Sequence, residues 1–315
     1  MDPFDNLLRG LHADGAAFGR SVLTPPSALR FTDGAPLTLC VPMRGEGWIS
    51  HPDSDKPRLV RVGEAAIVRG PAPFVFSAEP RSSFEPGELR DVRRGQTGVV
   101  DPAGADHNER LVLLVGVYHV RGRVPQRLLG ALPPVLVVPE DQDCAALRDY
   151  LDAQLDACRP GRQVVLDRLL DWLLVCTVRD WFDQPEAEAP GWYRALSDET
   201  VGPVLRAMHD APGRPWTLAS LAAQAGVSRS TLAKRFTALV GEPPLTYLTD
   251  WRMAVAADLL SESTATVAAV ARRLGYADAF GFSAAFKRVH GLSPSGHRRL
   301  AKPTHFGHLL STPRR

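Results

Sequence analysis

Apolar residues near the carboxyl end of the 315-residue chain recur at the spacing of a helix face. One stripe begins at Leu218 and another at Val267, each with apolar residues at the third, fourth and seventh positions after the first. Each stripe runs up to a glycine, Gly226 or Gly275, after which a second helical pattern begins. This order predicts a helix-turn-helix, whose second helix lies in the major groove of DNA.

The two helix pairs are copies of one unit. Equivalent residues stand 50 positions apart in three cases, namely Phe236 and Phe286, Gly241 and Gly291, and Pro244 and Pro294. Ser228 and Asp278, both good N-cap residues, stand at the start of the second helix of each copy. One copy alone would fit any pair of packed helices equally well, but two copies in register favour DNA binding.

Residues 244–262, between the copies, predict one continuous helix with an apolar face. Tyr247, Trp251, Val255 and Leu259 recur on that face. A stiff helix would hold the two recognition helices at a fixed separation. If that separation is about 34 Å, one turn of B-DNA, a single chain contacts two successive major-groove segments.

Sequence motifs cover this repeated region, which is about the last third of the chain. They are GVSRSTL at 226–232, VGEPP at 240–244, YL at 247–248, WRM at 251–253, GYAD at 275–278, Phe282, AFKR at 285–288 and GLSP at 291–294. They resemble the double helix-turn-helix domain of AraC-type transcription regulators. The resemblance implies an all-α domain that binds double-stranded DNA sequence-specifically, and that contacts RNA polymerase if the protein is an activator.

The two recognition helices carry different side chains. The first offers hydrogen-bond donors for guanine edges and phosphates at Arg229, Ser230, Thr231, Lys234 and Arg235. The second carries Phe280 and Ser283 near its start and its charge later, at Lys287 and Arg288. Family members usually place Arg where Ala284 stands. We therefore predict that the first copy supplies most sequence discrimination, while the second contacts phosphates and senses thymine methyl groups or groove shape.

The amino-terminal part shows short apolar runs separated by Gly, Pro and Asp, which is typical of β-strands. The runs are 28–32, 37–41, 47–50, 58–62, 65–69, 74–78 and 111–120. They indicate a sandwich or a small barrel, and the polar stretch 79–110 predicts a long loop. Motifs at 28–31, 44–48, 62–64, 69–70 and 128–134 resemble the cupin-like amino-terminal domain of one subgroup of AraC-type regulators, which implies a cupin-like β-barrel.

Residues 143–190 predict a pair of helices and a linker. The second helix carries apolar residues such as Trp172 on more than one side. Such a helix either packs between domains or joins a second chain in a homodimer, and the family resemblance favours the dimer. The predicted fold is α+β and multidomain: a cupin-like sensor at 1–142, a helical dimerisation and linker region at 143–190, the double helix-turn-helix domain at 191–300 and a basic tail at 301–315.

Charge is distributed unevenly along the chain. The net charge is +2, but residues 205–315 hold 15 Lys and Arg against 6 Asp and Glu, a balance of +9, which leaves −7 for the remainder. The positive charge therefore lies in the repeated region, where phosphate contacts require it. We find no signal-peptide pattern and no apolar run that could cross a bilayer, so the expected location is the cytoplasm and no membrane partner is predicted.

Metal chemistry is not favoured by the histidine pattern. A cupin enzyme usually presents two His, a Glu and a further His to a metal. Here Asp53 stands two residues after His51 in place of a second His, and Pro73 falls near the place of another ligand. We therefore predict no metal, no cofactor and no catalytic residue. The alternative is a metal-dependent cupin enzyme with an accessory DNA-binding domain.

A barrel without metal still has an interior that can bind a small molecule. The candidate lining residues are Phe31, Cys40, Trp48, Phe74, Phe76 and Tyr118, although such residues also form closed apolar cores. Cys40 is also a candidate for oxidant sensing, but a buried thiol is usually inert and the predicted barrel contains no second cysteine. The predicted effector is a small molecule or an oxidant.

Overall fold

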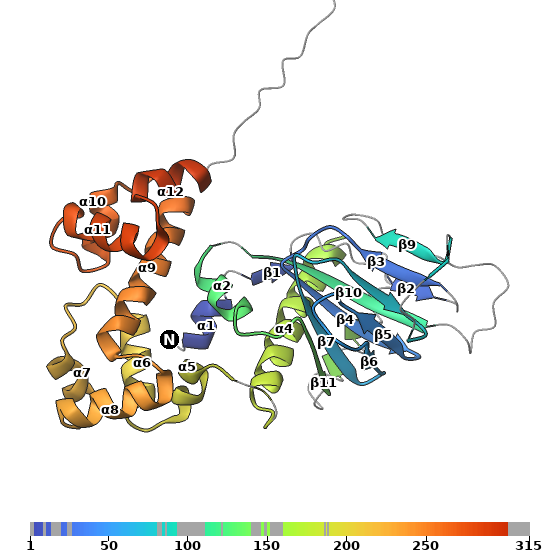
Figure 1. The fold of residues 1–315 in the computed structure, drawn as a ribbon, viewed down its shortest axis with the longest axis horizontal. Coiled ribbons are helices and arrows are strands. Elements are labelled where there is room, and N and C mark those ends of the chain that lie inside the picture. Colours follow the sequence, from blue (N-terminus) through green and yellow to red (C-terminus); the bar gives the residue numbers. More distant parts are fainter. Residues whose placement is uncertain are drawn as a thin grey trace, which may run out of the picture. The chain divides into compact units, whose positions relative to one another are not determined.

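The computed structural model describes residues 3–8, 11–13, 20–23, 27–80, 84–85, 87–92, 111–120, 122–139, 146–147, 150–151, 160–185, 187 and 189–301. The chain forms two compact units (Figure 1). The first comprises residues 4–121 and 125–194 and contains the β-structure. The second begins at Ala195, is helical, and also takes in residues 1–3 and 122–124. Apart from Ala301, the predicted basic tail lies outside the described residues.

Two β-sheets form the framework of the amino-terminal unit. The larger has the order β1-β10-β4-β7-β11, with β2 also pairing with β10, and all its pairs are antiparallel. Its strands are β1 (Leu11–Ala13), β2 (Arg20–Leu23), β4 (Leu37–Arg44), β7 (Glu64–Arg69), β10 (Leu111–Val120) and β11 (Val135–Pro139).

The smaller sheet has the order β6-β5-β8-β3-β9, in which only the β3–β9 pair is parallel among the described strands. Its strands are β3 (Ala28–Phe31), β5 (Gly47–Ser50), β6 (Arg58–Val60), β8 (Phe74–Ser77) and β9 (Leu89–Val92). Buried residues of both sheets, such as Val115 from the larger and Phe76 from the smaller, share one core. Within the described residues the strands thus form a cupin-like sandwich of two sheets, which confirms the predicted cupin-like fold in its sandwich form; the sheets do not close into a barrel.

The seven predicted strands are all present, with small differences at their ends. The sequence pattern missed β1, β2, β9 and β11. Strand β9 falls in the stretch 79–110 that was predicted to be a loop, of which 93–110 lie outside the described residues. A strand of four residues with two charged side chains shows no apolar alternation, so β9 could not be found from periodicity.

One helix, α4 (Arg162–Phe182), packs against the larger sheet. The hydroxyl of Tyr118 on β10 donates to the carbonyl of Leu170 at 2.8 Å, and a Cβ at Gly116 would lie 3.2 Å from the Leu170 side chain. The opposite face of α4 exposes apolar side chains, among them Val164 and Trp172, the latter 54% exposed. The prediction of apolar residues on more than one side is confirmed. Three short helices, α1 (Pro3–Leu8), α2 (Val124–Leu129) and α5 (Gly191–Arg194), also lie in the described part of this region. Residues 146–147 and 150–151, within the first helix predicted for 143–190, are helical as well.

The carboxy-terminal unit contains the repeated helices. After a short 3-10 turn, η1 (Ala195–Ser197), they are α6 (Val201–Asp210), α7 (Leu218–Gln224), α8 (Arg229–Val240), α9 (Pro244–Glu262), α10 (Val267–Arg273), α11 (Ala279–His290) and α12 (Pro294–Ala301). The predicted continuous helix over 244–262 is confirmed by α9, which runs between the two copies (Figure 1). No helix in the described part of the chain is both long enough and apolar enough to cross a membrane.

Candidate DNA-binding interface

Side-chain caps fix the start of both recognition helices. The Ser228 hydroxyl accepts a hydrogen bond from the Thr231 amide at 3.1 Å, and the Asp278 carboxylate accepts one from the Gly281 amide at 2.7 Å. These bonds satisfy amide groups that the first helical turn leaves without a partner. The predicted N-caps of α8 and α11 are therefore confirmed.

Burial sets which face of α8 points outward. Leu232 and Phe236 are fully buried, whereas the five predicted DNA-binding residues of this helix are exposed. Arg229 and Lys234 make no hydrogen bond or ion pair with any other described residue. Their charged groups are thus available for a base edge or a phosphate.

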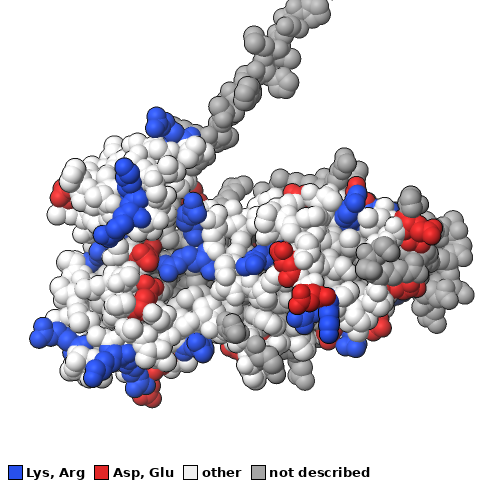
Figure 2. Space-filling view, viewed as in Figure 1, with Lys and Arg blue, Asp and Glu red and all other residues white. Residues whose placement is uncertain are grey.

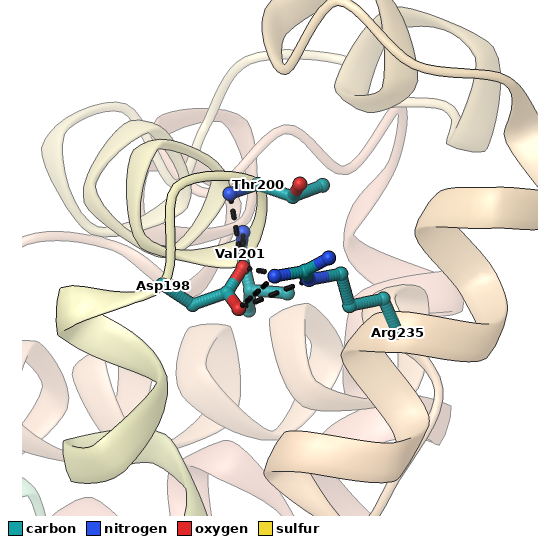
Figure 3. Close-up of polar contacts among 4 residues, drawn as sticks. All are labelled: Asp198, Thr200, Val201 and Arg235. Atoms are coloured by element: carbon teal, nitrogen blue, oxygen red, sulfur yellow. Dashed lines mark hydrogen bonds and ion pairs between the residues drawn. The ribbon is translucent and has the colours of Figure 1, made fainter.

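The remaining three predicted residues of α8 have partners within the protein. The hydroxyls of Ser230 and Thr231 lie 3.0 and 2.8 Å from the Ser228 hydroxyl at the cap. Arg235 forms a two-point ion pair with Asp198, with contacts between 2.8 and 3.1 Å (Figure 3). Asp198 was not identified from the sequence, because nothing in the local pattern links it to α8.

Helix α11 presents different chemistry from α8. Phe282 and Phe286 are buried, while Phe280 is 86% exposed, as the second residue of the helix. The Ser283 hydroxyl donates to the Ala279 carbonyl at 2.7 Å, so its hydrogen is already used within the helix. Lys287 and Arg288 are exposed in the last turn, whereas His290 is half-buried and its Nε2 lies 3.0 Å from the Met253 carbonyl oxygen.

The two copies also touch directly, in addition to being joined by α9. Arg252 of α9 donates to the carbonyls of Pro212 and Arg214 at 2.6 and 2.8 Å, in the loop between α6 and α7. In the same loop, a Cβ at Gly213 would lie only 2.2 Å from the Arg273 carbonyl oxygen at the end of α10. The loop of the first copy therefore packs against the backbone of the second, a contact that the sequence analysis missed.

Basic side chains follow this arrangement. Figure 2 shows Lys and Arg clustered at the α8 end of the helical unit and further Lys and Arg scattered from the α12 end to the middle of the unit. Basic side chains at both ends of the unit suit phosphate contact by both copies.

The predicted ligand-lining residues of the amino-terminal unit are divided between different environments. Phe31 and Phe74 stack at 4.5 Å and line a pocket with Thr38 and Val68. Its free volume is about 10 Å³, room for about one water molecule. Cys40 and Phe76 lie in the core between the sheets, and Trp48 is half-buried on β5. Tyr118 lies on the other face of β10 and bonds to α4.

Burial governs the chemistry of Cys40. Its side chain is fully buried, and this desolvation raises the pKa of the thiol far above its ordinary value. Cys40 and Cys176 are both free thiols, while Cys144 and Cys158 lie outside the described residues. A neutral, buried thiol is a poor nucleophile toward oxidants.

His51 is the histidine nearest to the expected metal-binding pattern. It is buried, and its Nδ1 accepts a hydrogen bond from the Asp53 amide at 3.1 Å. Its Nε2 has no hydrogen-bond partner among the described residues. Within that part of the chain, no three His, Cys, Asp or Glu side chains lie close enough together to hold a metal ion.

Comparisons with known proteins match both units. A family model described as a cupin matches residues 2–183, and one described as a helix-turn-helix domain matches 221–300. An AraC-like transcription regulator of Streptomyces lividans is 31% identical over 303 residues, which cover 95% of this chain and 98% of that protein. One from Streptomyces antibioticus is 30% identical over 315 residues, covering 96% and 100%.

Among solved structures, the DNA-binding domain of the global transcriptional factor AdpA in complex with a target DNA is 31% identical to this chain. The match covers 32% of this chain and 91% of that one, with a TM-score of 0.31.

Proposed function

Because this chain belongs to the AraC family of transcription regulators and carries a cupin domain at its amino end, we propose that it recognises its operator through two unequal helices. Helix α8 supplies the base-specific hydrogen bonds, chiefly through Arg229 and Lys234. Helix α11 contacts the next major-groove segment through Phe280 and holds phosphates with Lys287 and Arg288.

The contrast between the exposed side chains of α8 and α11 carries this proposal. Arg229 and Lys234 are exposed donors without a partner among the residues that the structure describes, as direct readout of base edges requires. The exposed ring of Phe280 forms no hydrogen bond, so it suits a thymine methyl group or the shape of the groove. The hydroxyl of Ser283 contributes as an acceptor or through van der Waals contact, since its hydrogen is bound to Ala279.

Selection of bound duplexes from a random library by the full-length protein tests the proposal. We expect an enriched sequence with two blocks one helical turn apart, in which the first block is defined more strictly. In the selected duplex, Lys234→Ala should relax the preference at one position of the first block, and Phe280→Ala at a thymine of the second. Failure of the wild-type protein to enrich any sequence would refute the proposal.

The amino-terminal unit is proposed to sense a small molecule or an oxidant. The pocket at Phe31 and Phe74 admits about one water molecule as it stands, so a larger effector enters there only if side chains move. The oxidant hypothesis expects that Cys40→Ser abolishes a response to hypochlorite and leaves the DNA affinity intact. Burial of Cys40 favours the small molecule.

Assembly and location belong to the same proposal. The exposed apolar side chains of α4, which are Val164, Val165 and Trp172, support a homodimer joined through this helix. The protein would work in the cytoplasm and contact RNA polymerase if it activates transcription. The expected organisation remains a sensor at 1–142, a dimerisation and linker region at 143–190 and a DNA-binding domain at 191–300.

A second candidate function is a metal-dependent cupin enzyme with an accessory DNA-binding domain. The unpartnered Nε2 of buried His51 is the observation that favours it. Metal analysis of the purified protein tests it, because stoichiometric iron, manganese or zinc that is lost in His51→Ala would support an enzyme. Absence of metal together with an enriched operator would favour the regulator.

A further inference from the structure

Asp198 and Arg235 form the most specific polar contact of the first helix-turn-helix (Figure 3). The Arg235 Nε lies 3.1 Å from Oδ1 and 3.0 Å from Oδ2 of Asp198, and Nη2 lies 2.8 Å from Oδ2. A guanidinium held by both oxygens of a carboxylate has a fixed direction, unlike one held at a single point.

Asp198 is itself fixed by the backbone. Its Oδ1 accepts hydrogen bonds from the amides of Thr200 and Val201, each at 2.9 Å, at the start of α6. Its side chain is only 12% exposed, whereas that of Arg235 is 52% exposed. The hydrogen bonds from Arg235 hold the pKa of Asp198 below its ordinary value, so the carboxylate is charged at neutral pH.

The segment that carries Asp198 is packed tightly against α6. We call residues 195–200 the junction, because they directly follow the end of the amino-terminal unit at Arg194. Arg206 of α6 donates to the Leu196 carbonyl at 3.1 Å, and a Cβ at Gly202 would lie 2.4 Å from the same oxygen. Ala195 is fully buried. The junction and α6 therefore behave as one body, to which Arg235 attaches α8.

We propose that Asp198 is a positioning residue for DNA recognition, which acts through Arg235 to set the orientation of α8 against the junction. Arg235 follows Lys234 directly in the helix, so restraint at Arg235 fixes the direction in which the neighbouring base-contacting side chain points. Arg235 then has a structural role, in place of the direct DNA contact predicted from the sequence. The inference rests on the proposed function, since it concerns the same interface.

The opposite hypothesis is that Asp198 competes with DNA phosphates for Arg235. If Asp198 merely withheld Arg235 from a phosphate, removing the carboxylate would strengthen DNA binding and raise its salt dependence by about one counterion. If Arg235 contacted a phosphate directly, removing Arg235 would lower the salt dependence by about the same amount. Positioning instead requires that loss of either partner weakens specific binding, with the salt dependence unchanged.

The experiment uses the full-length protein, the duplex that the wild-type protein enriches from a random library, and a random duplex. We expect Asp198→Asn and Arg235→Ala each to weaken binding to the enriched duplex on the order of tenfold, with little change on random DNA. The double variant should be no weaker than either single one, because both substitutions remove the same contact.

Lys234→Ala is the comparison variant, because it removes the adjacent cation of α8, which has no partner among the described residues. Asp198→Asn should cost less affinity in the Lys234→Ala background, because part of its effect passes through Lys234. Thermal unfolding of each variant shows whether weaker DNA binding comes from loss of the fold or from displacement of α8. If Arg235→Ala does not fold, Arg235→Lys takes its place, because it keeps the charge but not the two-point geometry.

Three outcomes would overturn the inference. They are tighter binding by Asp198→Asn, a reduced salt dependence in Arg235→Ala, and wild-type affinity in all folded variants. If the wild-type protein enriches no duplex, the proposed function fails. If it enriches one and the folded variants bind it as the wild type does, only this inference fails.

Discussion

Substitution of Gly213 by alanine tests whether direct contact between the two copies holds them in register. The added Cβ would meet the Arg273 carbonyl oxygen at 2.2 Å, whereas ordinary contacts begin at 3.4 Å. The obstacle is backbone, which cannot rotate away as a side chain could. The loop and the end of α10 must therefore separate by about 1 Å, at a cost of about 1–3 kcal/mol in the free energy of unfolding.

Two assays follow from this displacement. Thermal unfolding of the full-length protein should show the helical unit melting roughly 4–15 °C lower, given the entropy of unfolding of a domain of this size. Binding to a duplex that contains both groove segments should weaken, while binding to one that contains only the first segment should not change. The second copy moves relative to the first, so only simultaneous binding is affected.

Gly281→Ala is the control for stability in the same unit. A Cβ at Gly281 would approach the Asp278 carboxylate no closer than 3.6 Å, within α11. Alanine should stabilise that helix by about 0.5–1 kcal/mol. If Gly213→Ala melts at the wild-type temperature and binds both duplexes as the wild type does, the direct contact has no role in holding the register.

Three further predictions concern other parts of the molecule. Cys40 should resist alkylation by iodoacetamide at pH 8 in the folded protein and react after unfolding, because burial raises the pKa of its thiol; rapid labelling of the native protein would contradict this. Trp172→Glu on the exposed face of α4 should shift a dimer toward monomer in analytical ultracentrifugation without lowering the melting temperature of the monomer, and an unchanged dimer would place the interface elsewhere. The folded pKa of Asp198 is lowered, so the stability from its ion pair is present above its unfolded pKa of about 3.9 and is lost as the pH falls through the folded value. Thermal unfolding between pH 2 and 7 should therefore show a steeper acid loss in the wild type than in Asp198→Asn, and parallel curves would contradict it.

Local sequence patterns were sufficient to predict the helices of the carboxy-terminal unit. The caps Ser228 and Asp278 and the helix 244–262 depend on residues near one another in the chain, so spacing and side-chain type identify them. The strands were harder to predict, because β1 and β2 are only three and four residues long. Closure of the predicted barrel depends on pairing between distant strands, which periodicity does not encode.

The candidate interface was only partly predictable for the same reason. Exposure of Arg229, Lys234 and Phe280 follows from the apolar face of each helix. The partner of Arg235 stands 37 residues away in the chain, and the close approach of Gly213 to Arg273 joins the loop before α7 to the end of α10. Such contacts are set by tertiary packing, so the sequence alone could not distinguish a side chain free for DNA from one that is bound within the protein.

The close backbone approach at Gly213 also limits how the operator sequences of the regulated genes can change. If the operator has the two proposed segments, the protein dictates the number of base pairs between them, since the two copies cannot slide past one another at that point. Promoters under its control can exchange individual bases at a graded loss of affinity, whereas insertion or deletion of one base pair between the segments turns the second segment by about 34° around the DNA axis. A genomic search for two sequence blocks at a constant spacing should therefore find its target promoters even where individual bases of the blocks have been substituted.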